Sequence, residues 1–158
     1  MSTPRYSPAP ARGSYLAPDV DLPVHASVTI PGSKSLTNRE LMIAAIADGP
    51  GRLLRPLHSD DSRRMIDALR LLGVGIEEVP SDGEFGPDLL VTPAPLGGGV
   101  TIDCGQAGTV MRFIAPLAGI ARDDVHLTAD ENALHRPMGA IITALRDLGV
   151  DVDDEGNW

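Results

Sequence analysis

The sequence is poor in cysteine, aromatic residues and long apolar runs. Cys104 is the only cysteine among 158 residues, which excludes an intrachain disulfide and makes a reducing cytoplasm the expected setting. Aromatic residues make up 3% of the chain, so a core has to be built from aliphatic side chains. No stretch approaches the roughly 18 apolar residues of a membrane span, and no secretory signal is recognisable at the N-terminus.

Positive charge is scarce as well. The formal net charge is −9, which disfavours nucleic acid or an anionic membrane as a general partner. Lys34 is the only lysine, and it shares its position at a predicted helix start with Arg39, Arg112 and Arg136. Such a local group of cations in an acidic protein favours a small anionic ligand.

The pattern of apolar residues changes near residue 23. Residues 1–22 are rich in Pro, Ala, Ser and Gly without periodicity and are predicted to form a mobile tail. From residue 23 onward, short strands alternate with helices, which predicts an α/β (α+β) fold. The expected helices are 36–47, 60–72, 110–120 and 137–148, and the expected strands are 24–30, 52–56, 74–79, 88–92, 100–103, 124–128 and 150–152, with a loop at 130–136.

Part of the sequence is repeated. The segment Ala68–Ile76 matches Ala144–Val152, and Arg39 aligns with Arg112 in the first helix of each half. The repetition predicts two βαβαββ units, at about 23–96 and 97–158. The second unit is incomplete, so we expect the chain to be part of a longer protein.

The stretch Ile30–Arg39 has the composition of an anion site. A predicted strand leads through a Gly/Ser turn into a helix, so backbone N–H groups and the helix dipole converge with Lys34, Ser33 and Ser35. The spacing is not that of a P-loop, and a simple helix cap is the alternative interpretation. Taken singly, Arg112 is better explained as a solvated helix residue or a salt-bridge partner, and Arg136 is compatible with a simple surface position.

Four motifs carry a resemblance to a known family. Pro31–Arg39 resembles the signature of 5-enolpyruvylshikimate-3-phosphate (EPSP) synthases, and Gly105–Arg112 resembles their second signature. Arg136-Pro137-Met138 is similar to the family's Arg-Pro segment, and Ser59–Ser62 to its Asp-Asp loop. The motifs follow the family's order and approximate spacing, and the similarity extends from about Val24 to the end of the chain.

The resemblance implies a fold and a reaction. Members of the family have two domains, each with three βαβαββ units, and this chain would supply about two units of the first domain. They transfer the enolpyruvyl group of phosphoenolpyruvate to the 5-hydroxyl of shikimate 3-phosphate, a step toward the aromatic amino acids, and release phosphate through a tetrahedral ketal. No redox cofactor is implied, and the histidines show no metal-ligand spacing, so no cofactor is expected. A monomeric full-length protein is expected.

The resemblance also implies roles for individual residues, with Lys34 as the catalytic residue. It implies contacts with shikimate 3-phosphate from Lys34, Ser35 and Arg39, contacts with phosphoenolpyruvate from Lys34, Gly108 and Arg136, and a site lining of Gln106, Thr109 and Arg112.

Some positions depart from the family pattern. Gln106 stands where many relatives have Asn, and Phe113 stands where many have Pro. The family's acidic catalytic residues belong to the second domain, so this chain alone is expected to be inactive. Two alternatives remain: a UDP-N-acetylglucosamine enolpyruvyl transferase, and a non-catalytic anion-binding module.

Overall fold

The computed structural model describes residue 23 and residues 25–156, and the chain divides into two compact units, Met1–Ile30 and Pro31–Trp158. The described residues of the first unit contain neither helix nor strand, so the expected strand at 24–30 is wrong over residues 25–30. Val28 and Ile30 are about three-quarters exposed (76% and 75%). A strand needs a hydrogen-bonded neighbour, and none of the described strands pairs with this segment. Val24 and the expected tail, 1–22, lie outside the described residues.

The helices of the second unit lie close to their predicted positions. They are α1 (Lys34–Ala45), α2 (Asp60–Leu71), α3 (Gly108–Ala118) and α5 (Gly139–Asp147). Ser33 caps α1, and Ser59 forms a capping box with Ser62 at the start of α2. None of the helices in the described part of the chain is both long and apolar enough to cross a membrane.

Two helices of the C-terminal half differ from prediction. The expected loop at 130–136 contains a short helix, α4 (Glu131–Leu134), because the Asp130 carbonyl accepts the N–H groups of Ala133 and Leu134. Pro137 does not lie in the first turn of α5, since the helix begins at Gly139 with Met138 as its N-cap.

The strands form two small sheets. Strands β1 (Gly51–Leu53), β3 (Asp88–Thr92) and β2 (Gly75–Val79) are antiparallel in that order, which confirms the predicted hairpin. Strands β4 (Val100–Asp103) and β5 (Val125–Thr128) are parallel, with Asp103 opposite Thr128. The expected strand at 150–152 is not formed, and no described strand pairs with it.

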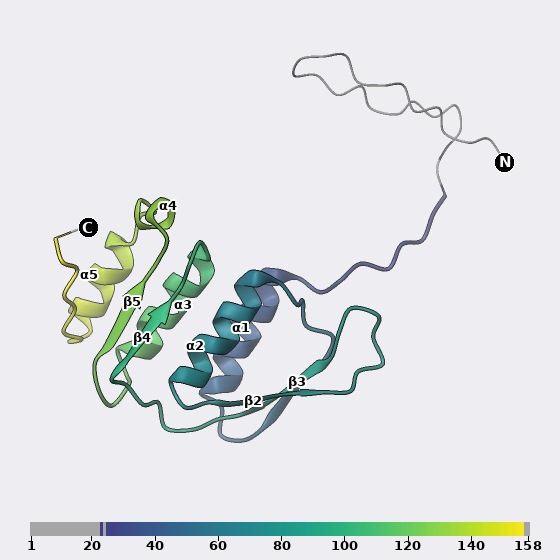
Figure 1. Ribbon diagram of the computed structural model, residues 1–158, viewed down its shortest axis with the longest axis horizontal. Coiled ribbons are helices and arrows are strands. Elements are labelled where there is room, and N and C mark those ends of the chain that lie inside the picture. The colour runs from purple at the N-terminus through teal and green to yellow at the C-terminus, as the bar shows by residue number, and fades with distance from the viewer. Residues whose placement is uncertain (1–22, 24, 157–158) are drawn as a thin grey trace, which may run out of the picture. The chain divides into compact units, whose positions relative to one another are not determined.

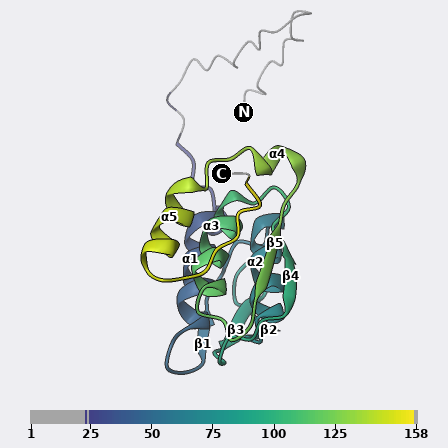
Figure 2. The same cartoon turned by 90° about the vertical axis from the view of Figure 1, so that its left-hand side faces the viewer.

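Three helices occupy the centre of the second unit. Helices α1, α2 and α3 pack on one another, β3 contacts α1, β4 contacts α2, and α5 packs beside α3 (Figures 1 and 2). The core is aliphatic as predicted, with Leu41, Met65 and Ile114 fully buried. The N-terminal ends of α1, α2 and α3 lie together at the upper side of Figure 1. The arrangement confirms a mixed α/β fold.

The two matched sequence segments have the same local structure. Arg70 donates from Nε and Nη2 to the carbonyl of Ile76, and Arg146 donates in the same way to the carbonyl of Val152. Each helix ends in a glycine with positive φ, Gly73 (99°) and Gly149 (89°). The duplication of whole βαβαββ units stays a prediction.

Candidate functional site

The loop before α1 packs tightly against a neighbouring backbone. A side chain on Gly32 would approach the carbonyl oxygen of Arg55 to 2.8 Å, and Thr37 Oγ1 accepts the N–H of Leu57 (2.9 Å). Arg55 has a positive φ of 49°, which is unfavourable for a residue other than glycine. The buried carboxylate of Asp88 stabilises it by accepting the Arg55 N–H (2.8 Å). The position of the loop therefore depends on a strained residue held by a buried acid.

The three side chains expected on this loop and helix have different surroundings. Lys34 is half-exposed, and its Nζ forms an ion pair of 3.0 Å with Asp61 in the first turn of α2. Arg39 donates from Nη1 to the carbonyl of Ser35 (3.1 Å), and its guanidinium lies 5.6 Å from the centre of the Phe113 ring. Ser35 is half-buried. All three groups lie on the first two turns of α1.

The start of α3 forms the second part of the site. Ala107 is the N-cap and provides no side-chain hydrogen bond, so the first N–H groups of the helix have no side-chain cap. Arg112 donates from Nη1 to the carbonyl of Gly108 (2.9 Å) and from Nη2 to that of Pro137 (3.0 Å). A side chain on Gly108 would overlap Arg136 Nη1 and approach Arg112 Nη1 to 2.9 Å. Two guanidinium groups therefore lie against one glycine at an uncapped helix start.

A direct hydrogen bond joins the two parts. Asn38 on α1 donates from Nδ2 to Thr109 Oγ1 on α3 (3.0 Å). Together with the Lys34–Asp61 pair, it confirms the prediction that the helix N-termini share one edge of the fold.

The loop that leads into α3 is held from both sides. One carboxylate oxygen of Asp103 accepts the Gly105 N–H (2.8 Å), and the other pairs with Arg64 Nη1 of α2 (2.7 Å). These two contacts, first the Gly105 N–H and then Arg64, hold the pKa of Asp103 below its usual range. Gly105 has a φ of 50°, and a side chain on it would overlap the Arg64 guanidinium. Burial raises the pKa of the adjacent Cys104 thiol to about 11, so Cys104 is a neutral packing residue, as expected.

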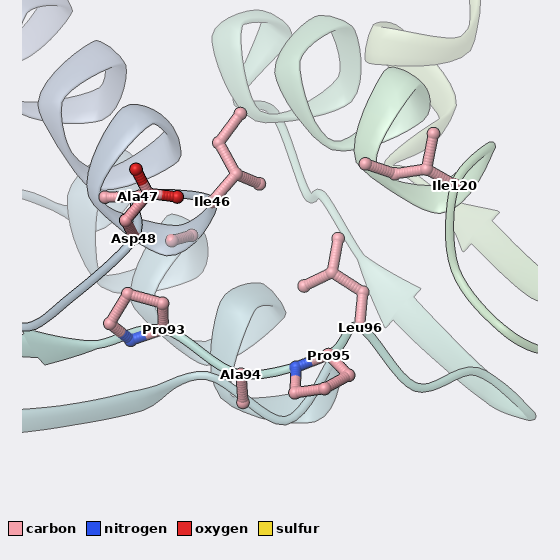
Figure 3. Close-up of a pocket in the computed structure, with 9 residues that line it drawn as sticks. Ile46, Ala47, Asp48, Pro93, Ala94, Pro95, Leu96 and Ile120 are labelled. Carbon is pink, nitrogen blue, oxygen red and sulfur yellow. The ribbon is translucent and has the colours of Figure 1, made fainter.

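The surface has one hollow beside this region and another at the opposite end of α1. A hollow of about 730 Å³ is lined by the first turns of α2, by Asp130 and by Gln106, which is exposed. A smaller hollow of about 360 Å³ lies at the C-terminal end of α1, where Ile46, Leu96 and Ile120 surround it (Figure 3). Only the first hollow borders Asp61, the partner of Lys34.

These features define the class of the protein: an α/β domain that gathers cations at parallel helix N-termini, an arrangement suited to anionic ligands. The family model for EPSP synthase (3-phosphoshikimate 1-carboxyvinyltransferase) matches residues 20–158. The chain belongs to the EPSP synthase family.

Individual relatives agree with this assignment. A 3-phosphoshikimate 1-carboxyvinyltransferase of Kocuria rhizophila is 50% identical over 138 residues, which cover 85% of this chain and 31% of the relative. Two solved structures of EPSP synthase from Acinetobacter baumannii match with a TM-score of 0.64 and 27% identity, over 82% of this chain and 30% and 29% of theirs. The chain thus spans about a third of the length of the relatives it matches.

Sequence reasoning missed several residues that build the site. Asn38 follows the spacing of the buried residues Leu41 and Ala45 along α1, so its helical periodicity identifies it as a polar residue on an apolar face. The contact between Arg64 and Asp103 joins residues 39 positions apart, and no local pattern signals it.

Proposed function

We propose that this chain forms part of an enzyme that transfers the enolpyruvyl group of phosphoenolpyruvate to the 5-hydroxyl of shikimate 3-phosphate. Membership of the EPSP synthase family and the name of the Kocuria rhizophila relative support this activity. The observation that carries it within the chain is the pair Arg112 and Arg136 around Gly108, at a helix start without a side-chain cap. Guanidinium groups and free backbone N–H groups are the donors that phosphate and carboxylate prefer.

Shikimate 3-phosphate is proposed to bind at the start of α1. Lys34 supplies a charge at the first residue of the helix, and Ser35 and Arg39, one turn apart, supply a hydroxyl and a planar donor on one helix face. The contact with Phe113 restrains the Arg39 guanidinium. An anionic substrate has to compete with Asp61 for the Lys34 ammonium, which is half-exposed and therefore accessible.

Phosphoenolpyruvate is proposed to bind between Lys34 and the start of α3. Gly108 allows close approach to the backbone because it has no side chain, and Arg136 lies directly beside it. Arg112 and Thr109 line the same helix turn. Gln106 is assigned to the site lining with less support from contacts, since it is exposed on the hollow next to α2.

The reaction requires charge stabilisation rather than an electron carrier. The 5-hydroxyl loses its proton as its oxygen bonds to C2 of phosphoenolpyruvate, and the C2–C3 double bond takes up a proton at C3, which gives the tetrahedral ketal. The C2–O bond to phosphate then breaks, and C3 loses a proton to restore the double bond. In the proposal, Lys34 and the two arginines stabilise the phosphate charge during both steps, and Lys34 is the proton donor within this chain.

The proposal extends to the setting of the enzyme. Its partners are the two anionic substrates, its full-length form is a monomer, and it works in the cytoplasm, where the free thiol of Cys104 stays reduced. Gel filtration of the full-length protein tests the monomer.

A phosphate-release assay on the full-length protein tests the activity. Phosphoenolpyruvate is supplied with shikimate 3-phosphate or with UDP-N-acetylglucosamine, and we expect release with the first acceptor only. Lys34→Ala should abolish release, whereas Arg122→Ala, a matched control at an exposed turn, should leave it near the wild-type rate. Release with the second acceptor alone, or a near-normal rate for Lys34→Ala, would contradict the proposal.

A further inference from the structure

Asn38 is the polar residue most completely buried in the described part of the chain. Its side chain is 0% exposed, and its Nδ2 donates to Thr109 Oγ1 at 3.0 Å. Its Oδ1 is buried and has no hydrogen-bond partner among the described residues. A buried oxygen without a partner costs stability, so the stability of the fold does not account for asparagine at this position.

The direction of the hydrogen bond determines what the Thr109 hydroxyl can do. A hydroxyl has one proton to donate and can accept from other groups. Because Thr109 Oγ1 accepts from Asn38, its own proton is free for another acceptor. The observed direction pairs one of the two Nδ2 N–H groups, whereas the reversed amide would leave both of them buried and unpaired, which favours the observed direction.

Thr109 lies next to the position proposed for the anion. It is the second residue of α3, next to Gly108 and on the helix start that has no side-chain cap. It is half-buried, so part of it remains accessible, whereas Asn38 is not accessible at all.

We infer that Asn38 is a positioning residue that acts through Thr109, keeping the Thr109 hydroxyl as a donor to the anionic group bound at the start of α3. The inference rests on the proposed function, because phosphoenolpyruvate is the anion assigned to that position. It makes Asn38 a determinant of affinity for phosphoenolpyruvate although Asn38 does not touch it.

A double-mutant cycle on the full-length enzyme tests the inference. Asn38→Ala, Thr109→Val and the double variant are compared by KM for each substrate at a saturating level of the other. Each single variant should raise KM for phosphoenolpyruvate by roughly tenfold, the loss expected for one hydrogen bond to a charged group, and leave KM for shikimate 3-phosphate within about twofold. In the Thr109→Val background, Asn38→Ala should add almost nothing.

Three further variants serve as controls. Thr109→Ser keeps a hydroxyl and should recover most of the affinity lost in Thr109→Val, while Thr92→Val, at the end of β3, should change neither KM. Asn38→Asp has the shape of asparagine, but its carboxylate only accepts hydrogen bonds and draws the Thr109 proton toward itself. It should therefore raise KM for phosphoenolpyruvate more than Asn38→Ala does. Thermal melts establish that each variant is folded at the assay temperature. If both Asn38 variants unfold, the Thr109 pair carries the test, and an unchanged KM in Thr109→Val overturns the inference.

The outcomes separate this inference from the proposed function. A wild-type protein that releases no phosphate from phosphoenolpyruvate and shikimate 3-phosphate overturns both. An active wild type in which the losses from Asn38→Ala and Thr109→Val are additive, or affect both substrates equally, overturns the role of Asn38 alone.

Discussion

Substitution of Gly108 by alanine should weaken the binding of phosphoenolpyruvate without destabilising the fold. A Cβ there would approach Arg112 Nη1 to 2.9 Å and Arg136 Nη1 more closely still, inside the 3.0 Å that such atoms keep. Both atoms are ends of flexible side chains, so they can withdraw without moving the backbone. The withdrawal takes two guanidinium groups away from the proposed phosphoenolpyruvate position.

The expected size of the effect follows from the bonds at risk. A hydrogen bond to a charged group contributes about 1.5–3 kcal/mol, and each 1.4 kcal/mol is roughly a factor of ten in affinity. If the shift weakens one such bond, Gly108→Ala should raise KM for phosphoenolpyruvate by about 10- to 100-fold. Steady-state kinetics with each substrate varied in turn should show a much smaller change for shikimate 3-phosphate, and thermal unfolding should show almost no change in Tm.

Gly32→Ala provides the matched comparison. The methyl group there meets backbone rather than side-chain ends, because Arg55 O is 2.8 Å away and Leu57 N is 3.2 Å away. Backbone cannot withdraw locally, so we expect a loss of about 1–3 kcal/mol in unfolding free energy, measured by denaturant titration. Equal losses of stability in the two variants, or an unchanged KM for phosphoenolpyruvate in Gly108→Ala, would refute the reasoning.

Three other predictions concern stability and reactivity. Ser59→Ala removes the side chain that caps α2 and should lower the unfolding free energy by about 1 kcal/mol in urea titration, and an unchanged midpoint would contradict a role for the cap. The pKa of Asp88 is lowered, first by the Arg55 N–H and then by Ser81 and Arg52, so its stabilisation is complete above the unfolded value of about 3.9 and is lost as pH falls through the folded value. Asp88→Asn should therefore be less stable at neutral pH and flatten the acid side of the stability profile, and a profile parallel to wild type would argue against it. Burial and the raised pKa, to about 11, should keep Cys104 unreactive toward iodoacetamide at pH 8 until denaturant opens the fold, and fast labelling of the native protein would contradict this.

Local sequence signals predicted the elements that depend on local interactions. The helices that became α1 and α2 have capping serines, Ser33 and Ser59, and the hairpin of β2 and β3 joins strands that are close in the sequence, through residues 80–87. The errors fall where structure depends on distant partners. Residues 25–30 and 150–152 have strand-like composition but no neighbouring strand in the described chain, and strand composition alone does not supply one.

The candidate site also has a part that the sequence predicted and a part that only the structure revealed. The motifs identified the charged residues and Gly108, and the repeat predicted that their helix ends would share an edge. The supporting contacts came only from the structure, because they join residues far apart: Asn38 with Thr109, and Arg64 with Asp103. In each of these pairs, one partner lies in the first predicted unit and the other in the second.

Arg70 at the end of α2 and Arg146 at the end of α5 make the same pair of hydrogen bonds, and this has a consequence for protein engineering. In both places nine residues, Ala68–Ile76 and Ala144–Val152, contain the last turn of the helix, the glycine with positive φ and the arginine, whose side chain donates to the carbonyl six residues further on. The bonds that end the helix therefore lie within one short segment, which makes it a candidate helix terminator for design. Such a segment, with one arginine followed after one intervening residue by Leu-Gly-Val, can be placed at the end of a helix in an unrelated design to end that helix.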